Sequence, residues 1–177
     1  MEREIKYYDY DEAIEAINED ISEIQYCADE LFDDDEIHND YLFNNGEVLK
    51  YLPDYLKADD GAVRNAIYNY GSAIQYASDA FKSNKIFALI AITNDPCSIE
   101  YFSEEIKSDE MLALTAIRLN NYAINYISLK LLSDLDFLKQ KLFWVDHTAP
   151  EVLKDSIIKE VKKINKGAAM WLSSWGD

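Results

Sequence analysis

Five tyrosines recur at intervals of 25 residues in this chain of 177 residues: Tyr26, Tyr51, Tyr76, Tyr101 and Tyr126. An Ile or Leu stands two residues before each tyrosine, and a Leu, Phe or Ile stands five residues after it. A capping-type residue follows at the eighth position: Asp34, Asp59, Asn84, Asp109 and Asp134. A period of this length, kept through five copies without a gap, indicates an internal repeat and predicts an array of stacked units.

The residues within one repeat predict two short helices. Asp and Asn are strong N-cap residues, and in residues 62–70 the helix that follows carries a buried-type Ala66-Ile67 pair. The sequence then breaks at Gly71, and Ser72 with Gln75 has the spacing of a capping box that opens a second helix. Neither helix could bury its apolar stripe alone, so stacked neighbours must supply the missing surface. We therefore expect an all-α fold, an α-solenoid of helix-turn-helix repeats with a 25-residue period.

The same phasing suggests how the chain is organised. We expect a single domain, with an acidic N-terminal repeat or cap at residues 1–36, phased repeats at 37–136, and a divergent C-terminal helix and tail at 137–177. The tail contains Trp171 and Trp175, which would form either a lid on the last repeat or an exposed contact.

The tyrosines themselves leave two interpretations open. At 100° per residue, the tyrosine lies about 130° from the centre of the apolar stripe of its own helix, so it falls outside the core of its own unit. It would either pack between adjacent repeats, with its hydroxyl at the rim, or form an exposed aromatic strip that binds a partner.

Two segments of the chain resemble a known family: AIYNYGSAIQYASDAFKSNK, and ALIAITNDPCSIEYFSEEIKSDEMLALTAIRLNNYAINYIS. They are similar to the bacterial and large-virus repeats called domain of unknown function 4116, and the resemblance extends over roughly residues 38–135. The Asn-Gly of that family is present at Asn45-Gly46 and replaced at Tyr70-Gly71, Asp95-Pro96 and Asn121-Tyr122. The resemblance implies a helical repeat protein, and no catalytic residue follows from it.

Charge is the strongest compositional signal. The formal net charge is −17, and residues 1–60 hold 4 Lys or Arg against 20 Asp or Glu. This distribution repels nucleic acid phosphates and attracts basic proteins, so we expect a protein partner, a basic one, and no direct binding to nucleic acid. The predicted contact residues are Tyr7, Tyr8, Tyr10, Asp33, Asp34, Asp35 and Glu36.

Two functions compete on this evidence. The first is an interaction module that binds and neutralises a basic partner, such as a nuclease toxin or a nucleic-acid-handling protein, through the acidic N-terminal surface. The second is a passive repeat scaffold that binds through its middle repeats, near Tyr68, Arg118 and Asn121, with acidity serving solubility. A partner affinity that does not change with salt concentration would favour the second function, the passive scaffold.

Catalytic, metal and membrane functions find little support. The chain has no GxGxxG, P-loop, HExxH or GxSxG motif, and enzyme activity would have to depend on His38, His147 or Cys97. The acidic run from Asp33 fails the EF-hand pattern, and Cys27 and Cys97 lack a CxxC partner, so no metal or cofactor is expected. The absence of a long apolar run and of a signal-peptide pattern predicts a cytoplasmic protein away from membranes.

Overall fold

The computed structural model describes residues 4–33, 45–134, 137 and 159, and this part of the chain is all-α. It contains no β-strand, only an isolated parallel bridge between Tyr7 and Cys27. Four helices of ten residues are the longest described elements: α1 (Tyr10–Glu19), α4 (Asp60–Asn69), α6 (Lys85–Asn94) and α8 (Glu110–Leu119). None of the described helices is long and apolar enough to cross a membrane.

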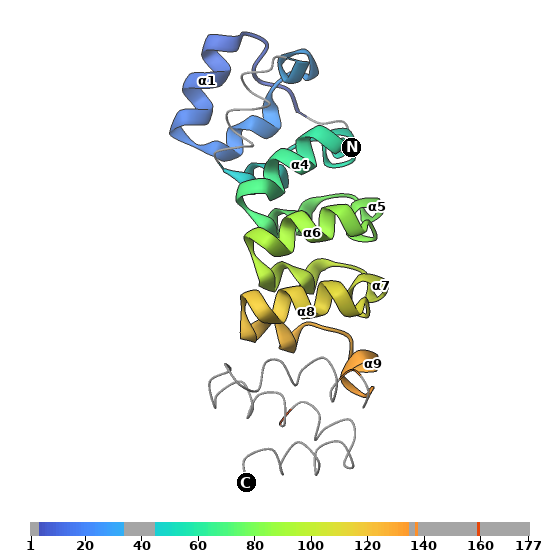
Figure 1. Cartoon of the computed structure of the whole chain (residues 1–177). Helices are drawn as coiled ribbons and strands as arrows, with labels where there is room; N and C mark the ends of the chain where they lie inside the picture. Colours follow the sequence, from blue (N-terminus) through green and yellow to red (C-terminus); the bar gives the residue numbers. More distant parts are fainter. Residues whose placement is uncertain (1–3, 34–44, 135–136, 138–158, 160–177) are drawn as a thin grey trace.

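Each long helix is followed by a 3₁₀-helix and then by a short helical segment. The 3₁₀-helices are η1 (Ile21–Tyr26), η4 (Gly46–Lys50), η5 (Gly71–Tyr76), η6 (Pro96–Tyr101) and η7 (Asn121–Asn125). The short segments are η2 (Asp29–Asp33), α3 (Asp54–Lys57), α5 (Asp79–Lys82), α7 (Glu104–Lys107) and α9 (Leu129–Leu132). Figure 1 shows α4, α6 and α8 stacked in chain order, with α5, α7 and α9 along one edge.

The prediction of one second helix in each repeat is therefore wrong in detail, because a 3₁₀-helix and a separate short helix take its place. Ala77 is extended at φ −72° and ψ 162°, which ends η5 before α5 begins. The N–H of Ser78 then donates to the carbonyl of Lys57, 2.9 Å away in the preceding short helix, instead of continuing a helical ladder. The same bond joins Ser103 to Lys82 and Ser128 to Lys107. Because this backbone donor has its acceptor in the neighbouring unit, the helix does not continue through it.

The predicted N-caps of the long helices are confirmed. The side chain of Asp59 accepts from the N–H of Ala62 at 2.8 Å, and that of Asn84 accepts from Ile86 at 2.9 Å. Asp109 caps α8 in the same way. These bonds satisfy donors that the first turn of a helix leaves without partners.

The capping box predicted at Ser72 and Gln75 is wrong. The N-cap of η5 is Tyr70, which makes no side-chain capping bond, and the Gln75 amide donates to the Ser72 carbonyl at 3.1 Å. The 3₁₀-helix begins at Gly71, two residues earlier than the box requires, so Ser72 lies inside it. Its hydroxyl donates instead to Asp95 of the next unit.

The core runs along the stack between the long helices and the 3₁₀-helices. The predicted Ala-Ile pairs are confirmed at residues 66–67, 91–92 and 116–117, where every side chain is fully buried. Ile74, Ile99 and Ile124, from the 3₁₀-helices, are fully buried as well. Neighbouring long helices also contact each other, so each unit covers part of the apolar surface of the next.

A close approach between successive units depends on glycine. A Cβ at Gly71 would overlap the carbonyl oxygen of Ala91 at the end of the next long helix, and a Cβ at Gly46 would lie 2.6 Å from the carbonyl oxygen of Ala66. No described glycine has a positive φ, so the requirement is one of space rather than of backbone conformation. The start of η5 therefore needs a residue without a side chain to reach α6.

We predict that Gly71→Ala lowers the free energy of unfolding by about 1–3 kcal/mol, because the new methyl group must push two backbones apart. Gly61→Ala is the matched control: it lies exposed in the first turn of α4, and its Cβ would meet only the Asp59 side chain at 3.2 Å. That control should be neutral or gain up to about 1 kcal/mol from helix propensity. Chemical denaturation of both variants would check this, and equal effects would contradict it.

Ser98 provides a second test of the core. Its side chain is fully buried, its hydroxyl has no hydrogen-bond partner, and the equivalent positions one unit away hold Ala73 and Ala123. We predict that Ser98→Ala raises the free energy of unfolding by about 1 kcal/mol, because the buried hydroxyl was desolvated without compensation. The exposed Ser83→Ala control should change it by less than about 0.5 kcal/mol. A loss of stability in Ser98→Ala would show that the hydroxyl has a partner.

Candidate protein-binding surfaces

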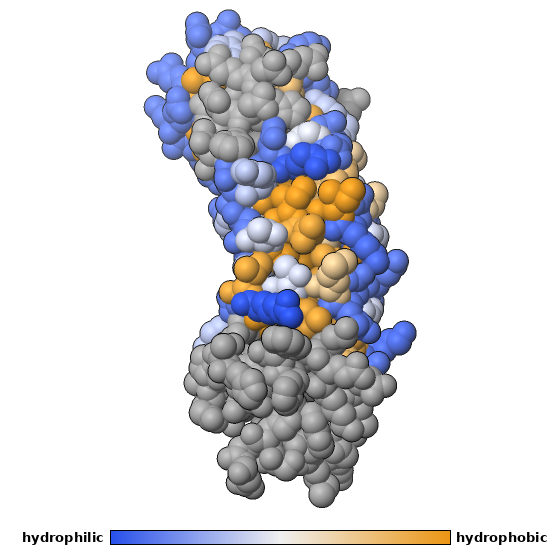
Figure 2. Space-filling view, viewed as in Figure 1, coloured by the Kyte–Doolittle hydropathy of each residue, from blue (hydrophilic) through white to orange (hydrophobic). Residues whose placement is uncertain are grey.

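The outer sides of α6 and α8 expose large apolar residues in the middle of the stack. Ile86 is 63% exposed, Leu89 50% and Met111 72%, values usual for polar side chains. Figure 2 shows the corresponding apolar patch over the middle of the described stack, with hydrophilic residues above and below it. We call Ile86, Leu89, Ile90, Met111 and Leu114 the outer apolar patch.

A groove adjoins this patch between α4 and α6. It has a volume of about 500 Å³ and mixes apolar with amide and hydroxyl groups. Its lining residues are Tyr68, Asn69, Leu89, Ile90, Thr93 and Asn94. Leu89 and Ile90 thus belong to both features, and both walls of the groove mix apolar surface with hydrogen-bonding groups.

Two ion pairs lie beside the outer apolar patch, and Arg118 is exposed on the same helix as Met111 and Leu114. The Arg64 guanidinium contacts both carboxylate oxygens of Asp60 at 3.0 and 3.1 Å and lies 5.0 Å from the centre of the Phe87 ring. Lys85 contacts Asp109 at 2.6 Å. This hydrogen bond raises the pKa of Lys85 and lowers that of Asp109, so both groups are held in their charged forms.

The C-terminal ends of α4, α6 and α8 carry a ladder of polar contacts between units. The Tyr70 hydroxyl donates to Glu47 at 3.0 Å and the Ser72 hydroxyl donates to Asp95. The Asn120 amide donates to the Cys97 sulfur at 3.7 Å. Each contact joins the N-cap residue of one 3₁₀-helix to the second helical residue of the preceding one, 23 residues earlier. Sequence reasoning missed this ladder, although its spacing is regular.

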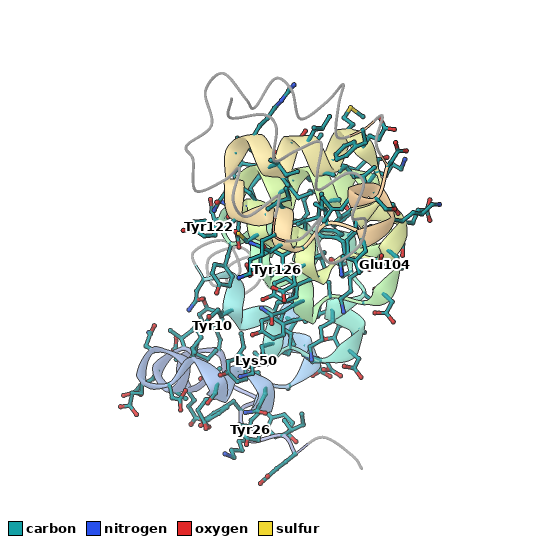
Figure 3. The ribbon with its side chains drawn as sticks, turned by 90° about the horizontal axis from the view of Figure 1, so that it is seen from below. Tyr10, Tyr26, Lys50, Glu104, Tyr122 and Tyr126 are labelled. Atoms are coloured by element: carbon teal, nitrogen blue, oxygen red, sulfur yellow. The ribbon has the colours of Figure 1, made fainter. Side chains whose placement is uncertain are left out.

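The repeated tyrosines lie at the C-terminal ends of the 3₁₀-helices. Tyr51, Tyr76, Tyr101 and Tyr126 are half-buried against the core, and successive 3₁₀-helices contact one another, so the four rings form a row. In Figure 3 the labelled Tyr26, Lys50 and Tyr126 lie away from the outer face of α8. The tyrosines thus pack on the core while keeping part of each ring accessible.

Lysines of the chain itself cover the first two of the five rings. The Lys6 ammonium lies 3.6 Å from the centre of the Tyr26 ring, and the Lys50 ammonium lies 5.1 Å from that of Tyr51. Gln75, Glu100 and Asn125 stand where Lys50 stands in its unit, and no described cation covers the other three rings.

Tyr101 is half-buried and follows the exposed Glu100 in the chain. Burial raises its pKa most, followed by the negative charges of Glu100 and Asp95, and then by the neighbouring Tyr126 and Tyr76.

The predicted N-terminal contact residues have different surroundings. Tyr7 is half-buried and its hydroxyl donates to Glu23 at 2.7 Å, while Tyr10 packs against the core at the start of α1. Tyr8 is 73% exposed. The side chain of Asp33 and the whole of residues 34–36 lie outside the described part. Partner binding by this set stays a prediction, and only Tyr8 among its described side chains is broadly accessible.

Other expected residues are placed as follows. His38, His147, Trp171 and Trp175 lie outside the described residues, as does the side chain of Asn121. Tyr68 lines the groove, and Arg118 is exposed at the end of α8. These two of the residues expected to bind a partner through the middle repeats therefore lie near the outer apolar patch. The described part of the chain contains no cluster of metal-ligating side chains.

The two cysteines differ in environment. Cys27 is fully buried, as expected for an apolar filler, whereas Cys97 is only partly buried. Burial raises the pKa of the Cys97 thiol, and Asp95 and Glu100 raise it further. An activated cysteine has a lowered thiol pKa, so the raised pKa of Cys97 is the opposite of what a reactive thiolate requires.

Comparison with known proteins agrees with the resemblance seen in the sequence. Residues 62–107, from α4 to α7, match the family described as domain of unknown function (DUF4116). No curated protein matches the chain. No solved structure matches it either.

The Tyr7–Glu23 contact predicts a pH dependence. The hydrogen bond to Glu23, burial and the Glu23 charge raise the pKa of Tyr7 to about 12 from 10.0, so folding favours the protonated phenol. Its stabilising contribution should be complete below pH 10 and disappear between pH 10 and about 12. The difference in unfolding free energy between wild type and Tyr7→Phe should be constant up to pH 10 and shrink above it. A difference that stays constant to pH 12 would contradict this.

Proposed function

We propose that this protein is an α-solenoid of 25-residue units and acts as a protein-interaction module, with the outer apolar patch as its contact surface. The occupant that this surface fits best is an amphipathic helix of a protein partner. The exposure of Ile86, Leu89 and Met111 in the middle of the stack is the observation that carries the proposal. No catalytic role is proposed.

The recurrence of the elements supports the solenoid. α4, α6 and α8 begin at residues 60, 85 and 110, and the short helices α3, α5, α7 and α9 begin at 54, 79, 104 and 129. The inter-unit bonds from Ser78, Ser103 and Ser128 have equal geometry, from 2.9 to 3.0 Å. Units joined by the same contact at each step build an extended array with one continuous face.

The shape and charge of the outer face support a helical partner. Ile86 and Leu89 lie three residues apart on α6, and Met111 and Leu114 repeat that spacing on α8. A helix seated beside them could place apolar side chains at i, i+3 and i+4 against the patch and into the groove. Because Asp60–Arg64 and Lys85–Asp109 are internally paired, the partner needs no strong net charge.

We predict that the double variant Leu89→Asp, Met111→Asp lowers partner binding at least tenfold, because two charges would be buried against an apolar helix. Both residues are exposed, so the midpoint of unfolding should change little. Leu129→Asp is the matched control: Leu129 is 60% exposed on a short helix away from the patch.

The measurement combines capture from native lysate with a photocrosslinking residue placed at position 89 or 129. The proposal requires a protein that crosslinks at position 89 but not at 129, is lost with the double variant, is kept by Leu129→Asp, and binds with little dependence on salt. Equal capture by the double variant and the control would contradict the contact surface.

A further inference from the structure

Two arginines border the outer apolar patch, and only one of them is paired. Arg64 lies on α4, where its guanidinium contacts both carboxylate oxygens of Asp60, one turn earlier on the same helix. Arg118 lies exposed in the last turn of α8 and makes no hydrogen bond or ion pair with the part of the chain that the structure describes. The second guanidinium is therefore the one that can take a charged group from a partner.

The helices around Arg118 explain why it lacks such a group. The residue one turn earlier on α8, where Arg64 has Asp60, is Leu114. Helix α6, which packs against α8, contains no Asp or Glu. The one carboxylate within α8 is that of Glu110, and it stands about 12 Å before Arg118 along the helix axis. Among the described neighbours, nothing supplies a carboxylate at the end of α8.

Arg118 belongs to the same stripe of α8 as two residues of the outer apolar patch. Met111, Leu114 and Arg118 are spaced at i, i+3 and i+7, which is one face of a helix. On α6 the corresponding stripe ends at Thr93, which stands where Arg118 stands one unit later. The outer face is thus apolar toward the starts of α6 and α8 and polar toward their ends.

We infer that the amphipathic helix bound by the outer apolar patch runs antiparallel to α8 and carries a carboxylate in its first turn, which pairs with Arg118. This inference rests on the proposed function, because it specifies the partner of the same surface. A planar guanidinium donates two parallel hydrogen bonds to one carboxylate, so Arg118 fixes the register and direction of the bound helix.

The helix dipoles favour the antiparallel direction. A carboxylate is stabilised in the first turn of a helix and a cation in the last turn, where Arg118 already stands. An antiparallel partner brings its first turn to the end of α8, so that both dipoles favour the ion pair. A parallel partner would offer the carboxylate from its last turn, where its own dipole opposes the charge.

The spacing on α8 gives the pattern that the partner should carry. Leu114 lies four residues and Met111 seven residues before Arg118. Two helices packed side by side advance by the same rise, so apolar residues should follow the carboxylate after four and seven positions. The net charge of −17 repels anions at longer range, and the best fit is therefore one carboxylate at this position in a helix of little net charge.

The test uses three synthetic peptides of fourteen residues, each held helical by a hydrocarbon staple on the side away from the contact. The first has Glu in its first turn and Leu four and seven positions later, with Ala and Gln elsewhere. The second replaces this Glu with Gln, and the third has the residues of the first in reverse order. Affinity for the full chain is measured by fluorescence anisotropy at about 50 and 500 mM salt.

We expect the Glu peptide to bind about 3- to 5-fold more tightly than the other two, and this difference to shrink at high salt. In Arg118→Gln, which changes an exposed side chain and should fold normally, the Glu and Gln peptides should bind equally. Lys130→Gln is the matched control: Lys130 is another exposed cation, on α9 away from the patch, and its loss should leave the preference for Glu unchanged.

Equal binding of the Glu and Gln peptides to wild type would overturn the inference and leave the outer apolar patch as a contact surface. A preference for Glu that survives in Arg118→Gln, or that Lys130→Gln also removes, would overturn it too, since the preference would not come from Arg118. Equal affinity of the reversed peptide would overturn the antiparallel direction. If none of the peptides binds, or if Leu89→Asp, Met111→Asp binds them all unchanged, the proposed function fails together with the inference.

Discussion

The structure depends on contacts that each unit can make only with its neighbours. The N–H of Ser78, Ser103 and Ser128 has its acceptor in the preceding short helix, and Gly71 leaves room for the end of α6 in the next unit. Ten-residue helices and one-turn helices are marginal alone in water. Stacking buries their apolar sides and satisfies their backbone groups at the same time, so the units stabilise one another.

This mode of assembly leaves two long faces available along the same molecule. The long helices turn their outer sides away from the core, where Ile86, Leu89 and Met111 remain exposed. The 3₁₀-helices hold the half-buried tyrosine row on the other side, next to carboxylates. One face is apolar with two ion pairs beside it, and the other carries aromatic rings.

Much of the local structure could be predicted from the spacing of a few residue types. The caps Asp59, Asn84 and Asp109 and the buried Ala-Ile pairs follow from helix propensity and periodicity, which act within a few residues. The prediction of a capping box at Ser72 was wrong because Ser72 bonds to a neighbouring unit: its hydroxyl donates to Asp95 instead of capping a helix. For the acidic N-terminal set, the structure shows the Tyr7 hydroxyl bonded to Glu23 and Tyr10 packed against the core.

The sequence by itself determined the all-α class, the starts of α4, α6 and α8 and the excess of negative charge, because each depends on residue type and local spacing. Only the tertiary structure decided which side of each unit faces its neighbour. That choice divided the expected second helix at Ala77 and left Leu89 exposed beside a groove. Contacts between residues 21 positions apart, Ser78 with Lys57 and Tyr68 with Leu89, accompany these features, and no local propensity encodes them.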